Sequence, residues 1–97
     1  IDICARMSAP IVVTADGVVA FSGWERGYGR VVKIDHGYGL GSKYAHLKKS
    51  LVKKGQRVKR GETIGLVGNS GKTTGVHLHY EVHVDGAPVN PLRYILK

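Results

Sequence analysis

The sequence predicts an all-β fold, a compact twisted antiparallel sheet or sandwich. Fourteen glycines are spread along the whole chain of 97 residues, and short runs rich in Val, Ile and Tyr lie between them. This pattern is typical of many short strands joined by tight turns. No stretch of a dozen residues has clean helical periodicity. A chain of this length has room for one domain, residues 1–97.

Six runs of apolar and β-branched residues are the candidate strands. They cover residues 11–14, 18–22, 30–35, 43–47, 63–67 and 77–84. The Asp-Gly pairs at 16–17 and 85–86 favour positive φ angles and predict hairpin turns, and the segment 68–71 (GNSG) predicts another connection. Residues 45–51 are the one candidate for a short helical turn.

A local repeat lies in the middle of the chain, where residues 52–57 (VKKGQR) are followed at once by residues 58–63 (VKRGET). Each unit reads as an apolar anchor, a solvated basic turn and a glycine with permissive φ. The alternative is a basic stripe for nucleic acid. The repeat contains no aromatic residue to stack on a base, so two successive turns with exposed lysines are predicted instead.

Charge and composition exclude several classes of protein. Fifteen Lys and Arg against seven Asp and Glu leave a formal charge of +8, which favours an anionic partner. No apolar run approaches the length of a transmembrane segment. Cys4 is the single cysteine, so an internal disulfide is excluded.

The Gly71-Lys72-Thr73 segment is not a phosphate-binding loop, because the glycine required five positions earlier is replaced by Leu66.

The segment 77–84 (HLHYEVHV) alternates with period two. On a strand, His77, His79, Glu81 and His83 therefore share one face. Neighbours on that face stand roughly 6.5–7 Å apart at Cα, so two side chains can converge on one ion. Imidazole suits zinc, and a catalytic zinc site typically has three protein ligands and one open position. The alternative is a polar strand surface that faces solvent.

Two further residues extend this constellation. His46 ends a candidate strand, and Asp2 stands between two apolar neighbours at the start of the chain. Alone, a histidine or aspartate in such a place is more often a surface group or a cap. Together with the His-x-His segment they match a family.

From Ile1 to Leu96 the sequence resembles the lysostaphin-like, or LytM-type, zinc metalloendopeptidases of bacterial cell-wall hydrolases. The resemblance rests on ordered landmarks that span nearly the whole chain. They are residues 1–3 (IDI), 15–19 (ADGVV), 27–29 (GYG), 34–37 (IDHG), 44–47 (YAHL), 55–58 (GQRV), 65–71 (GLVGNSG), 74–81 (TGVHLHYE) and 89–91 (VNP).

The resemblance implies a role for each residue of the constellation. Asp2 and His79 match zinc ligands, and His46 and His77 match the two catalytic histidines that face the water and the substrate. The remaining family ligand is a histidine four residues before Asp2, a position ahead of Ile1. We therefore expect a domain that is truncated just after this ligand, and the alternative is that the full-length protein lacks this histidine. His36 and His83 match no ligand position and are expected to be exposed or to line the groove.

The implied activity is zinc-dependent hydrolysis of amide bonds in the peptide stems or crossbridges of peptidoglycan, in the bacterial cell envelope. No residue is assigned to substrate binding. The alternative is a non-catalytic member of the same fold that binds peptidoglycan or activates an amidase. A lipoyl or biotinyl carrier is disfavoured because no lysine stands at an exposed hairpin tip. A nucleic-acid-binding barrel would rest on charge alone, so nucleic acid is not a predicted partner.

Overall fold

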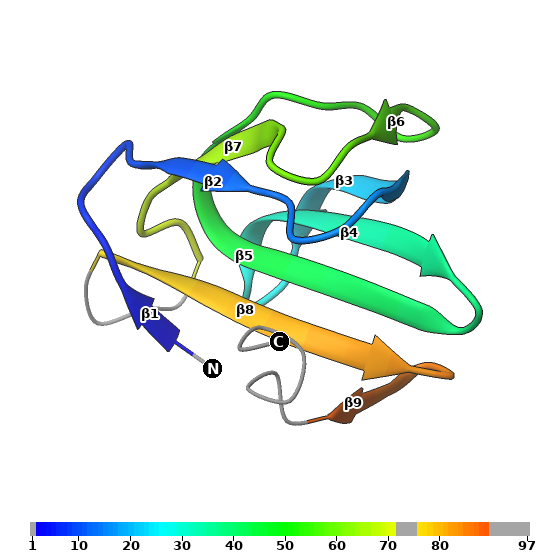
Figure 1. Ribbon diagram of the computed structural model, residues 1–97. Helices are drawn as coiled ribbons and strands as arrows, with labels where there is room; N and C mark the ends of the chain where they lie inside the picture. Colours follow the sequence, from blue (N-terminus) through cyan, green and yellow to red (C-terminus); the bar gives the residue numbers. More distant parts are fainter. Residues whose placement is uncertain (1, 72–75, 90–97) are drawn as a thin grey trace.

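The computed structural model describes residues 2–71 and 76–89, without the side chains of Cys4 and His77. These residues form an all-β structure, as predicted, in which every strand pairing is antiparallel (Figure 1). The strands are β1 (Asp2–Cys4), β2 (Pro10–Val12), β3 (Gly17–Glu25), β4 (Gly29–Gly37), β5 (Leu40–Ser50), β6 (Arg57–Val58), β7 (Thr63–Val67), β8 (His77–Val84) and β9 (Ala87–Val89). Within these residues, no helix has the length and apolar character to cross a membrane.

The long strand β5 organises the sheet. The strand order is β1-β8-β5-β4-β3-β6, and the pair β2 and β7 joins the sheet through β7, which also bonds to β5. In Figure 1, β2 and β7 lie across one side of the layer formed by β4, β5 and β8. One face of this layer is therefore covered, and we call the opposite one the open face.

The hydrophobic core fills the covered face. Strand alternation sends Tyr44 and Tyr80 into it, with ring centroids 5.1 Å apart. Their hydroxyls are not orphaned, because Ser42 Oγ donates to Tyr44 and the Tyr80 hydroxyl lies 3.2 Å from Thr14 Oγ1. The buried core residues are Ile11, Val13, Val19, Val32, Ile34, Tyr44, Leu47, Val52, Val58, Ile64, Val67, Tyr80 and Val82.

Most predicted strands are present. The segments 63–67 and 77–84 match β7 and β8, three others lie inside β3, β4 and β5, and the strand predicted at 11–14 is β2. The helical turn predicted at 45–51 is wrong, because β5 runs on to Ser50. Its residue Leu47 pairs with Arg30 on one side and Val67 on the other, and ladder bonds of this kind override a weak helical preference.

The two Asp-Gly predictions have different outcomes. Asp85 and Gly86 have φ angles of 51° and 82°, as the predicted hairpin turn requires. At the first pair the prediction is wrong. Gly17 has no positive φ and begins β3, while Asp16 Oδ1 accepts a hydrogen bond of 2.7 Å from the Arg60 backbone.

The repeat at 52–63 forms two equivalent turns, as predicted. Val52 and Val58 are buried, and the basic residues of both units are exposed. In each unit a Gln or Glu side chain, Gln56 or Glu62, accepts a 3.2 Å bond from the backbone N–H three residues earlier. The turn glycines have φ angles of 91° and 85°, which explains their position in both copies.

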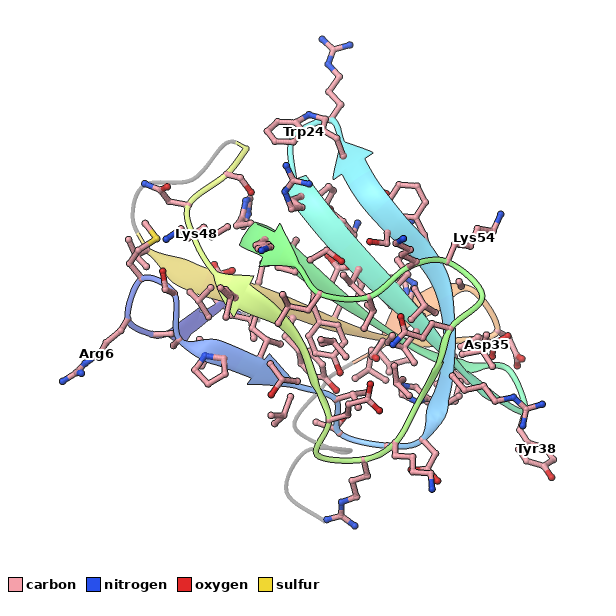
Figure 2. The ribbon with its side chains drawn as sticks, turned by 90° about the horizontal axis from the view of Figure 1, so that it is seen from above. Arg6, Trp24, Asp35, Tyr38, Lys48 and Lys54 are labelled. Carbon is pink, nitrogen blue, oxygen red and sulfur yellow. The ribbon has the colours of Figure 1, made fainter. Side chains whose placement is uncertain are left out.

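An ion-pair cluster lies on the open face. Lys43 is 6% exposed, and its ammonium contacts Glu25 Oε1 at 2.6 Å and the centre of the Tyr28 ring at 3.4 Å. Lys33 contacts the other Glu25 oxygen at 2.9 Å. The hydrogen bonds from Lys43 and then Lys33 hold the pKa of Glu25 below its usual range. Two aromatic residues, Trp24 and Tyr38, are exposed and lie outside this cluster. Both project away from the sheet in Figure 2.

The core makes a direct prediction about stability. Ile64 is fully buried, so Ile64→Ala is expected to lower the free energy of unfolding by about 2–5 kcal/mol through lost transfer energy and a residual cavity. Val12, which is 48% exposed, serves as the control. Val12→Ala is expected to change the free energy of unfolding by about 0.5 kcal/mol or less. Urea denaturation followed by circular dichroism measures both, and equal losses would contradict this core.

The ion-pair cluster predicts a pH-dependent effect. Glu25→Gln leaves the buried Lys43 ammonium without its carboxylate and is expected to cost about 1–3 kcal/mol at pH 7. Because the folded-state pKa of Glu25 is lowered, its contribution is complete above the ordinary pKa of glutamate and disappears as the pH falls through the folded value. The difference in free energy of unfolding between Glu25→Gln and the parent protein should therefore become smaller as the pH is lowered. Lys33→Gln is the control. The Lys33 side chain is 40% exposed, so its loss is expected to lower the free energy of unfolding by less.

Candidate functional site

The register of β1 against β8 brings Asp2 and His79 together. The two residues are direct partners across the strands, and Asp2 Oδ1 lies 2.7 Å from His79 Nδ1. They are 77 positions apart in the sequence. The side chain of Asp2 is 61% exposed and that of His79 is 23% exposed. The pair therefore lies at the solvent boundary of the open face.

Glu81 contacts the other side of the same imidazole. It follows His79 by two positions on β8 and shares its face, as the alternation predicts. Its Oε2 accepts a 2.5 Å bond from His79 Nε2, and its Oε1 accepts a 2.8 Å bond from His83 Nε2. Burial acts to raise the pKa of Glu81, but the hydrogen bonds from the two histidines together with the nearby Lys43 and His79 charges lower the pKa overall.

A β-bulge turns His46 toward this face. In the pairing of β5 with β4, the register shifts so that Ala45 and His46 stand against the single residue Val31. His46 takes a φ of 62°, in the region that glycine usually occupies, and its N–H donates 2.9 Å to the Tyr28 carbonyl. Without the extra residue, strict alternation would send His46 into the core beside Tyr44. With it, the His46 and His79 rings lie 5.9 Å apart between centroids.

The loop between β7 and β8 determines which nitrogen of His46 carries a proton. His46 Nδ1 lies 2.7 Å from the Ser70 carbonyl oxygen, which can only accept, so Nδ1 is the protonated nitrogen. Ser70 is itself anchored, since its Oγ donates to the Leu47 carbonyl at 2.6 Å. The backbone passes so close to Gly29 that a Cβ there would lie 2.4 Å from the Ser70 carbonyl carbon. His46 is therefore held in one tautomer.

Tyr28 connects the two histidines. Its ring centroid lies 6.4 Å from that of His46 and 5.6 Å from that of His79. The Lys43 ammonium sits against the same ring. A cavity of about 330 Å³ extends farther along the open face, bordered by Lys33, Lys43 and His83 among others. Two of the residues around this cavity contact site residues, since Lys43 lies against Tyr28 and His83 bonds to Glu81.

Three of the predicted site residues, Asp2, His46 and His79, come together in the part of the chain that the structure describes. The backbone of His77 begins β8 opposite Cys4, and its side chain lies outside the described residues. His83 is half-buried and borders the cavity, and its expected place in the groove stays a prediction. His36 is half-buried and bonded at 2.8 Å to both the Asp16 carbonyl and Ser42 Oγ.

The sequence analysis assigns no role in the site to four residues that contribute to it, Tyr28, Lys43, Ser70 and Glu81. Period-two alternation in 77–84 already placed Glu81 beside His79, so that signal was available. Lys43 precedes Ala45 by two on its strand and could have been placed by the same rule. Tyr28 and Ser70 act through loops, and no local pattern gives their position.

The donor atoms of the pair Asp2 and His79 fit a metal ion. At 2.7 Å, Asp2 Oδ1 and His79 Nδ1 share a hydrogen bond, so the two atoms face each other across one small gap. Carboxylate oxygens and imidazole nitrogens are both common zinc ligands in proteins, with bonds of about 2.0–2.2 Å. Among residues 2–71 and 76–89 no group of three or more His, Cys, Asp or Glu side chains is arranged to hold a metal.

The model of peptidase family M23 matches residues 1–91. The peptidoglycan DD-endopeptidase ShyA of Vibrio cholerae is 46% identical over 92 residues, which are 95% of this chain and 21% of that protein. This chain spans about a fifth of the length of the curated relatives it matches.

Solved structures agree with this match. A zinc containing peptidase from Vibrio cholerae superposes with a TM-score of 0.88 at 43% identity, over 91% of this chain and 27% of that one. The catalytic domain of lysostaphin from Staphylococcus simulans superposes with a TM-score of 0.94 at 27% identity, over 99% of this chain and 77% of that one. The lysostaphin-like resemblance is therefore confirmed, and the chain belongs to peptidase family M23.

Proposed function

We propose that this chain is the catalytic domain of a zinc metalloendopeptidase that hydrolyses amide bonds in the peptide stems or crossbridges of peptidoglycan, in the bacterial cell envelope. The observation that carries the proposal is the contact of Asp2 with His79 Nδ1, beside a His46 that is held in one tautomer. The printed names of relatives, a peptidoglycan DD-endopeptidase and a zinc containing peptidase, support the substrate and the metal. The formal charge of +8 suits an anionic cell wall.

Asp2 Oδ1 and His79 Nδ1 are the proposed zinc-binding atoms. The remaining ligand is the family histidine that the resemblance places four residues before Asp2. Zinc in such a site lowers the pKa of water toward ~7 and polarises the scissile carbonyl.

His46 and His77 are the proposed catalytic pair. The Ser70 carbonyl keeps the His46 proton on Nδ1, so Nε2 is the nitrogen that exchanges a proton with the reacting groups. One histidine of the pair takes the proton of the water and passes it to the leaving amine, while the other donates a hydrogen bond to the developing oxyanion.

The proposed roles separate the two histidines of the His-x-His segment. His79→Ala removes a metal ligand, so zinc binding and hydrolysis should be lost together. His77→Ala removes a proton-transfer group, so zinc should stay bound while hydrolysis falls by about 10²–10⁴-fold. The measurements are zinc content by mass spectrometry and digestion of purified peptidoglycan by the full-length protein, with chromatography of the released fragments. Equal zinc loss in both variants would make His77 a ligand and overturn these assignments. Zinc-loaded parent protein without hydrolysis would favour the non-catalytic alternative.

The anchoring of His46 gives a second prediction. In Gly29→Ala the new methyl group meets the Ser70 backbone at 2.4 Å, so the loop that holds His46 must shift. We expect hydrolysis to fall by about 10-fold or more, with zinc content unchanged. Gly27→Ala is a matched control, because Gly27 also has a positive φ, 84° against 73°, but a Cβ there meets nothing within 4 Å. Its activity should stay close to that of the parent, and equal losses in both variants would point to backbone strain instead.

A further inference from the structure

Resting on the proposed function, we infer that Glu81 is a positioning residue that fixes the ring of His79 so that Nδ1, rather than Nε2, is presented to the metal. No role for Glu81 follows from its motif alone. The inference comes from the contacts that its carboxylate makes on the open face.

The first step concerns the proton of His79. A carboxylate oxygen only accepts hydrogen bonds, so the 2.5 Å contact with Glu81 Oε2 places a proton on His79 Nε2. Nδ1 faces the Asp2 carboxylate, so a cation that replaces the proton between Nδ1 and Asp2 Oδ1 meets the Nδ1 lone pair, while Nε2 keeps its proton toward Glu81. A histidine that binds a metal characteristically donates its other N–H to such a partner, which fixes the tautomer and increases the basicity of the ligating nitrogen.

The second step concerns the orientation of the ring. Asp2 on β1 and Glu81 on β8 contact opposite nitrogens of His79, so a flip of the imidazole would break both contacts. The backbone of Glu81 is paired with Lys43 of β5, which fixes the position on β8 from which its carboxylate reaches His79. The side chain of Glu81 is 18% exposed, so water competes weakly for its oxygens.

The same geometry argues against Glu81 as a metal ligand. An ion between Asp2 Oδ1 and His79 Nδ1 lies on one side of the imidazole, while the Glu81 carboxylate lies on the other. Glu81 therefore acts through His79 and not on the ion.

The experiment compares three variants of the full-length protein, Glu81→Ala, Glu81→Gln and the matched control His83→Ala, which removes the other bond to Glu81. Zinc affinity is measured by competition with a chromophoric chelator. The His79 Nε2–H resonance of the zinc-loaded protein is followed by NMR, and thermal unfolding without zinc reports the fold. These readouts do not depend on hydrolysis.

We expect Glu81→Ala to weaken zinc affinity by about 10–100-fold and to lose the slowly exchanging Nε2–H signal. In Glu81→Gln the amide oxygen still accepts the bond, so the signal should persist and the loss of affinity should be smaller. His83→Ala should keep both the signal and an affinity close to that of the parent.

Parental zinc affinity in a folded Glu81→Ala protein would overturn the inference. If that variant does not fold, parental affinity and an absent Nε2–H signal in Glu81→Gln would overturn it. An equal loss of affinity in His83→Ala would also do so, because the effect would then not pass through His79. A parent protein that binds no zinc would instead overturn the proposed function, and this inference with it.

Discussion

The extra residue in β5 at Ala45 and His46 is the constraint on which the rest of the site depends. β5 pairs with β4 over residues 40–47, with β8 over residues 40–45 and with β7 over residues 47–50, so neighbouring strands fix its position on both sides of the bulge. The bulge lets Leu47 return to the core while His46 turns to the open face, at the cost of a φ of 62° for a histidine. Such strain persists where the surroundings overdetermine the backbone, and it is often found at functional sites.

Charged groups on the open face are held in pairs. Lys43 is buried between Glu25 and the Tyr28 ring, and Glu81 is held between two histidines. A buried ion without such partners would cost more than the fold gains from it, so each contact stabilises the fold and also restricts the motion of a site residue. Preorganised groups of this kind need little rearrangement when a metal or substrate binds.

The two faces of the sheet have different roles, since the covered face holds the hydrophobic core and the open face holds the candidate site. The covered face carries the apolar residues that determine stability. The repeat at 52–63 packs against them through Val52 and Val58. The basic residues of that repeat point to solvent and are not part of the cluster of His46, His79 and Tyr28. A substitution in one face can therefore be studied with limited disturbance of the other, apart from residues such as Leu47 that anchor the Ser70 loop.

The sequence by itself determined the all-β class, most strands, the two repeat turns and the face shared by His79 and Glu81, because period-two alternation and turn residues are local properties. It also carried the family resemblance that selected Asp2, His46 and His79 as site residues. Tertiary structure alone decided that Asp2 stands opposite His79 across 77 positions, and that His46 leaves the core face. Register and bulges depend on which strands pair, and pairing is decided by long-range packing that no short segment encodes.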